Sequence, residues 1–183
     1  YRDPHLRFKR HGETLYRNLF YRGALISAAI TVKLFASYKE IDDFLANEQD
    51  YSLISGDTPL ISNLNMLENI ALIKEVHELL PTQEAQAHAI ESLRLIDLEH
   101  IGLNRLNQCT SLEVFYVMVI RAMMAKEEVI FIVTPFFLIK KLARIEPVLE
   151  KLVLLNKEQK NIIILDNLTN QSHYKGDLCN IIK

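Results

Sequence analysis

Short apolar runs separated by longer amphipathic stretches follow one another along the chain, and they predict strands alternating with helices. Two runs, 129–133 and 161–165, are continuously apolar, as in strands buried on both faces of a parallel sheet. Residues 30–35 are rich in β-branched side chains, and 51–55 form a fourth short strand ahead of a Gly-Asp-Thr-Pro turn. The pattern therefore predicts an α/β core with a parallel sheet.

Apolar residues at helical spacing predict the remaining elements. Helices are expected at 14–25, 39–46, 67–80, 83–96, 112–124 and 138–156, and Thr82 is expected to cap the fourth of them. No strand is predicted between 65 and 125, so this part is expected to form an all-helical subdomain. It would be inserted into an α/β core built from residues 1–64 and 126–183, all within a single domain.

Composition and charge narrow the function classes. With 183 residues, 49% hydrophobic and 24% charged, the chain has the make-up of one folded domain. The net charge of −2 is not that of a general nucleic-acid-binding protein, so no nucleic-acid partner is expected. Cys109 and Cys179 lack the CxxC spacing of a zinc site and no His-x₃-His pair occurs, so no metal site is expected. No apolar stretch approaches the roughly 20 residues that span a bilayer, and no signal peptide is expected.

Several short segments of the sequence are similar to known motifs and follow one another in the same order as those motifs. The stretch Leu60–Leu72, LISNLNMLENIAL, is similar to LFPHLTVLENVAL, and residues 89–100, AIESLRLIDLEH, are similar to ALELLEKVGLEHL. Residues 109–113, CTSLE, with Arg121-Ala-Met after them, stand where LSGGQ and ARAL would stand. In this order and spacing the chain resembles, over nearly its whole length, the nucleotide-binding domain of ABC transporters. The resemblance implies a P-loop NTPase-like core with a parallel sheet and an inserted helical subdomain.

The same resemblance puts the family's phosphate-binding loop on residues 9–14, KRHGET. Thr14 then takes the loop's final hydroxyl position and Gly12 the position of its lysine, while Glu13 adds a negative charge. A phosphate loop needs glycines, whose backbone N–H groups curl around the phosphate, and a lysine that neutralises it. Gly12 and Thr14 are thus the remaining nucleotide contacts of a degenerate loop.

The other catalytic positions implied by the resemblance are also changed. They are Gly56 for the Q-loop glutamine, Ser111 for a signature glycine, Val133 for the Walker B aspartate, Thr134 for the catalytic glutamate, Lys140 for the D-loop aspartate and Asn167 for the switch histidine. Without carboxylates at 133 and 134, nothing there would hold magnesium or accept a proton from water near pH 7. Asp166 and Asn167 are better explained as residues that end a strand and begin a turn. The chain is therefore predicted to be a pseudo-ATPase that uses neither ATP nor Mg²⁺.

The segment that keeps the family's pattern best, Leu60–Leu72, is implied to be a docking surface. In the family, a short coupling helix of the membrane permease enters a groove beside the Q-loop. A helix starting near Met66 would leave too many apolar side chains ahead of it for a turn to hide. We therefore expect partly exposed docking residues, namely Leu60, Leu64, Met66 and Glu68.

These inferences predict a cytoplasmic, cassette-like subunit that is peripheral on the inner face of the membrane. Its partner would be an integral membrane permease, a second cassette subunit or both, and a homodimer is compatible with the sequence. Two alternatives stay open. One is a diverged but active ATPase of an ABC transport system, and the other is a stand-alone protein-interaction module.

Overall fold

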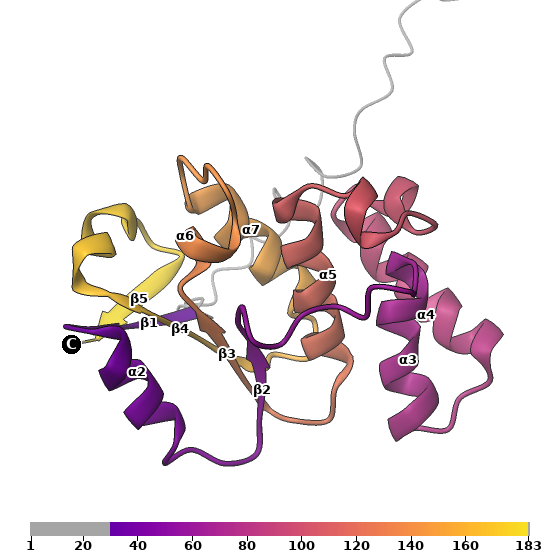
Figure 1. Ribbon diagram of the computed structural model, residues 1–183, viewed down its shortest axis with the longest axis horizontal. Coiled ribbons are helices and arrows are strands. Elements are labelled where there is room, and N and C mark those ends of the chain that lie inside the picture. The colour runs from indigo at the N-terminus through magenta and orange to yellow at the C-terminus, as the bar shows by residue number, and fades with distance from the viewer. Residues whose placement is uncertain (1–29, 183) are drawn as a thin grey trace, which may run out of the picture.

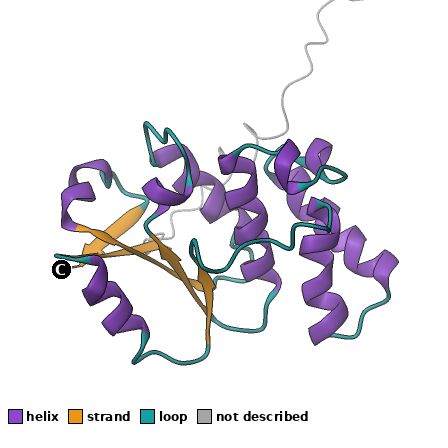
Figure 2. Cartoon of the chain, viewed as in Figure 1, coloured by secondary structure: helices purple, strands orange, loops and turns teal. Residues whose placement is uncertain are grey.

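The computed structural model describes residues 30–182, which form a parallel β-sheet covered by helices (Figure 1 and Figure 2). The five strands of this sheet are β1 (Ile30–Phe35), β2 (Tyr51–Ile54), β3 (Val129–Val133), β4 (Asn161–Asn167) and β5 (Cys179–Ile182). Their order is β2-β3-β4-β1-β5, and every neighbouring pair is parallel. The predicted α/β class with a parallel sheet is therefore confirmed. The helix expected at 14–25, with Gly12 and Thr14, lies outside the described residues.

Helices connect the strands, as parallel pairing requires. They are α2 (Tyr38–Leu45), α3 (Met66–His77), α4 (Thr82–Leu95), α5 (Ser111–Met124), α6 (Pro135–Leu138) and α7 (Glu146–Leu155), with short 3₁₀ turns at Glu99–Ile101, Leu106–Gln108 and Leu168–His173. Between β2 and β3 the chain is helical or irregular, apart from one isolated antiparallel bridge between Asn65 and Arg105. Figure 1 shows α3 and α4 at one side of the sheet, and α5 between them and the sheet.

Alternating side chains of the strands serve two separate apolar layers. Ile30 and Val32 of β1, with Ile162 and Ile164 of β4, face a large core formed with α3, α4, α5 and α7. Phe131 of β3 and Leu165 of β4 point to the opposite face, where a smaller cluster packs around Ile41 of α2. The period of two along each strand thus buries both faces of the sheet, one under α2 and the other under the remaining helices.

Two expectations about helices were wrong. The single helix expected at 138–156 is instead the short α6 and the separate α7, with 139–145 between them. Lys141 in this connection has a φ of 60°, a left-handed conformation that a continuous helix excludes. Pro147 lies in the first turn of α7, a position that proline fits. Thr82 does not cap α4: it lies within the helix, the cap position is Pro81, and no side chain bonds the first turn.

Candidate functional site

In parallel α/β sheets, ligands usually bind beyond the carboxyl ends of the strands, where successive connections leave in opposite directions. Here β1 connects to β2 at one edge of the sheet, whereas β4 connects to β5 at the other edge. Phe35 at the end of β1 is level with Asn167 of β4, and Val133 at the end of β3 is level with Leu165. The carboxyl ends of these three strands therefore define the candidate nucleotide edge.

The connection from β1 to α2 is a turn of two residues, Ala36 and Ser37. The Ser37 hydroxyl accepts a hydrogen bond from the Glu40 N–H at 3.3 Å, and the Glu40 carboxylate accepts one from the Ala36 N–H at 3.1 Å. A phosphate loop between a strand and a helix takes eight residues, with glycines and a lysine. The turn after β1 lacks this length and contains neither a glycine nor a lysine. Glu40 also places a negative charge at the N-terminus of α2, which would otherwise attract an anion.

The end of β3 carries no acid. Val133 is half-buried and packs against the apolar cluster under α2. Thr134 is buried, its backbone N–H donates to the Leu165 carbonyl at 2.9 Å, and its φ of 47° is left-handed. A β-branched residue in that conformation is an outlier that the surrounding structure must hold in place. Neither side chain supplies a carboxylate for a metal, and neither acts as a base near pH 7.

A buried carboxylate does lie at this edge, at Asp166 near the end of β4. Its Oδ1 accepts the Asn167 N–H at 2.7 Å and the Asn170 side-chain N–H at 3.0 Å, and its Oδ2 accepts the Tyr174 hydroxyl at 2.6 Å. Burial, together with the neighbouring Asp166 charge, raises the pKa of Tyr174 far above the ordinary value for tyrosine. The tyrosine therefore stays a neutral donor, and both carboxylate oxygens are occupied by the protein itself.

Asn167, at the position of the switch histidine, has a structural role. Its side-chain oxygen accepts the Thr169 N–H at 2.9 Å and so caps the 3₁₀ turn that follows β4. Its side-chain nitrogen donates to the Ala36 carbonyl at 3.2 Å, which joins the end of β4 to the turn after β1. The expectation that Asp166 and Asn167 begin a turn is confirmed.

Three further positions, for which the sequence predicted changed catalytic residues, come together in one cavity. Gly56, Ser111 and Lys140 line a cavity of about 350 Å³ between the loop after β2, the start of α5 and the end of α6. The Ser111 hydroxyl accepts the Lys140 N–H at 2.9 Å. Cys109 also lines this cavity, and burial, followed by the nearby Glu113, raises the pKa of its thiol. A thiol held protonated is a poor nucleophile.

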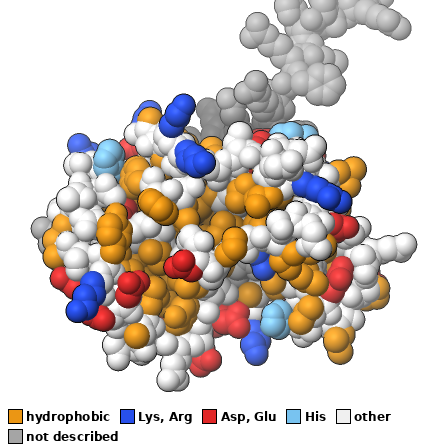
Figure 3. Space-filling view, viewed as in Figure 1, with side chains coloured by type: hydrophobic (Ala, Val, Ile, Leu, Met, Phe, Trp, Pro, Cys, Tyr) orange, Lys and Arg blue, Asp and Glu red, His pale blue; other side chains and the backbone are white. Residues whose placement is uncertain are grey.

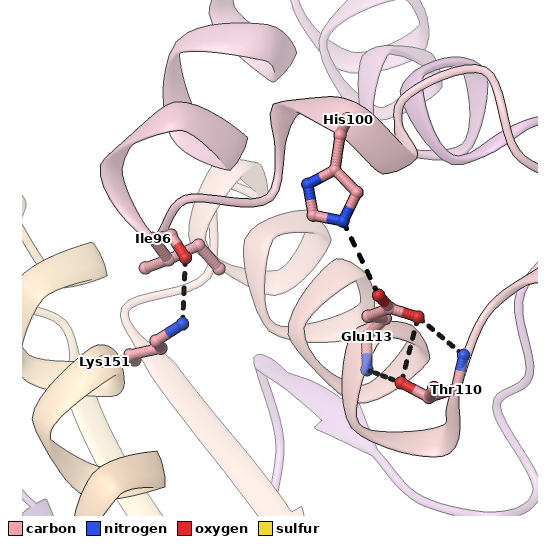
Figure 4. A network of polar contacts seen from close by, with 5 residues as sticks. All are labelled: Ile96, His100, Thr110, Glu113 and Lys151. Carbon is pink, nitrogen blue, oxygen red and sulfur yellow. Dashed lines mark hydrogen bonds and ion pairs between the residues drawn. The ribbon is translucent and has the colours of Figure 1, made fainter.

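The N-terminus of α5 is capped by its own side chains (Figure 4). Glu113 accepts hydrogen bonds from the Thr110 N–H at 2.7 Å and the Thr110 hydroxyl at 2.9 Å, and the Thr110 hydroxyl accepts the Glu113 N–H at 3.2 Å. His100 lies 3.8 Å from the same carboxylate. This capping box pairs the N–H groups of Thr110 and Glu113 and adds a negative charge, which disfavours a phosphate at this helix end.

The predicted docking residues are less exposed than expected. Leu60 and Met66 are 4% and 0% exposed, so the expectation that they form an open apolar patch was wrong. Leu64 is half-buried, and Glu68 accepts the Asn65 N–H at 2.8 Å as part of the cap of α3.

The buried side chain of Asn69, which was not predicted from the sequence to matter, holds the segment ahead of α3 in place. Its amide accepts the Ile61 N–H at 2.8 Å and donates to the carbonyls of Ile61 and Asn65, both at 3.0 Å. These bonds hold segment 61–65 against the first turns of α3, and Leu60 and Met66, on either side of the segment, are buried. Ile61 stays 38% exposed.

Residues 30–182 offer neither a metal site nor a membrane-spanning helix. No three His, Cys, Asp or Glu side chains gather there in an arrangement that could hold a metal ion. Within the same range, none of the helices combines the length and the apolar character needed to cross a membrane.

No protein-family model matches this sequence, and neither does any curated protein. Solved structures do match. The ATP-binding cassette MJ0796, in a dimeric post-hydrolysis state bound to ADP and Pi, has a TM-score of 0.57 and 17% identity over 82% of this chain and 79% of that chain. A dimeric structure of MJ0796 as a bacterial ABC transporter cassette has a TM-score of 0.52 and 21% identity, over 70% of this chain and 58% of that chain.

An inward-facing ABC transporter assigned to the metal-chelate type has a TM-score of 0.56 and 14% identity, over 76% of this chain and 63% of that chain. The match thus spans less than two thirds of the known chain in the second and third structures. Identities at this level establish the fold alone. The fold of this chain is that of the ATP-binding cassette of ABC transporters.

Proposed function

We propose that this protein is a cassette-like subunit that does not hydrolyse ATP and that works by binding partner proteins. The observation that carries the proposal is the two-residue turn between β1 and α2. In a fold whose nucleotide site lies at the carboxyl ends of the strands, this turn leaves no backbone to surround a phosphate. Glu40 and Glu113 place carboxylates at two helix N-termini that could otherwise bind anions.

The absence of acidic side chains at the end of β3, where the family would bind Mg²⁺, supports the same proposal. Val133 and Thr134 supply no carboxylate at the end of β3, and both oxygens of Asp166 are occupied by the chain itself. A magnesium ion prefers carboxylate and phosphate oxygens, so this edge would offer it little. We infer that neither ATP nor Mg²⁺ is a cofactor.

The partner in this proposal is an integral membrane permease, a second cassette subunit or both. The docking surface is the groove on either side of loop 55–60, because cavities border this loop toward α5 on both sides. Hydrophobic side chains are also exposed over much of the face in Figure 3. Such a subunit would be peripheral on the inner face of the membrane. A homodimer is a second arrangement, favoured by the dimeric state of the MJ0796 structures.

The test is a paired measurement on the full chain, with calorimetric titration of ATP and Mg²⁺ and a phosphate-release assay. We expect no binding heat and no turnover above a buffer blank, while a hydrolysing cassette run in parallel shows both. Turnover that disappears when Thr14, Ser37 or Thr134 is changed to alanine would contradict the proposal. That result would establish the diverged but active ATPase instead.

A further inference from the structure

A second cavity, also about 350 Å³, lies on the far side of loop 55–60 from the one that holds Gly56. Ser52 of β2 and Arg121 of α5 contribute its polar wall, and Ile73 of α3 contributes to its apolar wall. Pro59 and Met118 line both cavities, so the two adjoin beside α5 and form the groove at loop 55–60. In Figure 1 this loop leaves β2 and runs across to α3.

Arg121 is the residue of this cavity whose polar side chain has an unpaired, buried nitrogen. Its Nε is buried and has no hydrogen-bond partner in the described part of the chain. None of the ion pairs formed within residues 30–182 includes Arg121. Burial also lowers the pKa of the guanidinium, because the charged form has lost water without gaining a counter-charge. Native proteins seldom leave a buried donor unpaired, so its presence calls for an acceptor.

The neighbouring polar groups do not supply that acceptor. Ser52 donates its hydroxyl hydrogen to Glu127 at 3.1 Å, and Thr58 donates to the Leu53 carbonyl at 3.1 Å. Glu127 lies near the cavity, but it does not come within ion-pair distance of Arg121. The groove therefore combines one unpaired cation with apolar walls formed by Pro59 and Met118.

We propose that this groove binds a polypeptide segment of a partner protein whose Asp or Glu side chain pairs with Arg121. A carboxylate can accept two hydrogen bonds from a guanidinium at once, which would satisfy the buried Nε. Apolar side chains flanking the acid pack on Pro59, Ile73 and Met118. The occupant is a chain segment because the unpaired cation stands beside apolar residues, and an acidic side chain with apolar neighbours complements both, whereas a small anion complements only the charge. This inference rests on the proposed partner-binding function and adds the chemistry of the partner.

The test follows the Arg121 Nε–H signal by NMR in the full chain, labelled with ¹⁵N-arginine. The probe is the blocked peptide acetyl-Leu-Glu-Leu-amide, with the Gln peptide and sodium acetate as comparisons. We expect a saturable shift of the Arg121 signal with the Glu peptide and at least tenfold weaker binding of the Gln peptide. No shift with the Glu peptide would overturn the proposal. Acetate binding as tightly as the peptide would also overturn it, since the site would then serve a small anion.

Variants separate binding from folding. Arg121→Gln should abolish peptide binding, whereas Arg144→Gln, at a side chain that is 74% exposed, should leave it unchanged. If Arg121→Gln does not fold, Glu127→Gln provides the second test, because removing a nearby negative charge should tighten binding about two- to fivefold. Unchanged or weaker binding in Glu127→Gln would contradict the proposal. None of these readouts depends on ATP turnover, so failure here and failure of the pseudo-ATPase proposal remain distinct.

Discussion

The hydroxyl of Tyr174 is expected to be worth more to stability than most hydrogen bonds in this protein. It donates to the buried Asp166 carboxylate at 2.6 Å, and it is the partner that the structure shows for Oδ2. Tyr174→Phe removes this donor with little change in shape. The remaining bonds, from the Asn167 backbone and the Asn170 side chain, both reach Oδ1. The substitution therefore leaves one buried, charged oxygen without a donor.

The expected cost follows from that geometry. A hydrogen bond to a charged group is worth about 1.5–3 kcal/mol, and an unmet buried acceptor is penalised on a similar scale. For a chain of this size, a loss of that magnitude lowers the melting temperature by about 3–12 °C. Asp166→Asn in the Tyr174→Phe background should then cost less than it does alone, because the pair interacts directly.

Urea denaturation monitored by circular dichroism measures this cost, with Tyr38→Phe as the matched control. Tyr38 is 59% exposed, so its hydroxyl should be worth less than about 0.5 kcal/mol. A Tyr174→Phe variant within about 0.5 kcal/mol of the wild type would refute the reasoning. So would additive effects of Tyr174→Phe and Asp166→Asn, since they would show that the two side chains do not interact.

The same pair predicts a pH effect. Folding raises the pKa of Tyr174, so its contribution to the free energy of unfolding is fully present below the unfolded pKa of about 10. Above that pH the contribution falls by up to about 1.4 kcal/mol per pH unit. Urea denaturation from pH 8 to 11 should show this loss in the wild type and less of it in Tyr174→Phe. Met66→Glu, at a fully buried site, should cost about 3–5 kcal/mol in urea denaturation, whereas Ile61→Glu should cost under about 0.5 kcal/mol. Equal costs would place Met66 at the surface. Val133→Asp should restore no ATPase activity and should lower stability by about 1–3 kcal/mol at pH 8, less at pH 4; an unchanged melting temperature at pH 8 would contradict its packing under α2.

The sequence alone predicts much of the fold because the buried strands and helices carry local periodic signals. The strands at 30–35, 129–133 and 161–165 all occur within a residue or two of their expected bounds. β5 is missed because Asn180, Ile181 and Ile182 are exposed, so this edge strand lacks the apolar pattern of a buried one. The break between α6 and α7 is missed because apolar residues continue at helical spacing through Ile139 and Leu142.

The candidate site is predicted less well, because its contacts join residues from different elements. Exposure of Met66 is inferred from the number of apolar residues ahead of the helix, yet the Asn69 side chain decides their direction through bonds to Ile61. The hydrogen bond between Tyr174 and Asp166 likewise joins a strand to a residue beyond the next turn, so no local pattern predicts it. Arg121 did carry a signal, since a charged residue interrupts an otherwise apolar helix.

Three carboxylates, those of Glu40, Glu113 and Asp166, have one physical consequence in common, which bears on whether a phosphate site could be built into this fold. Glu40 and Glu113 each cap the N-terminus of a helix, and Asp166 is held by a tyrosine. In each case a carboxylate accepts hydrogen bonds from donors of the chain, so its removal would leave those donors unmet. Stability of the fold and recovery of a phosphate site are therefore opposed at these places. Restoring one acidic residue at 133 would add a buried charge without freeing any of these donors, and the two-residue turn after β1 would still have no room for phosphate.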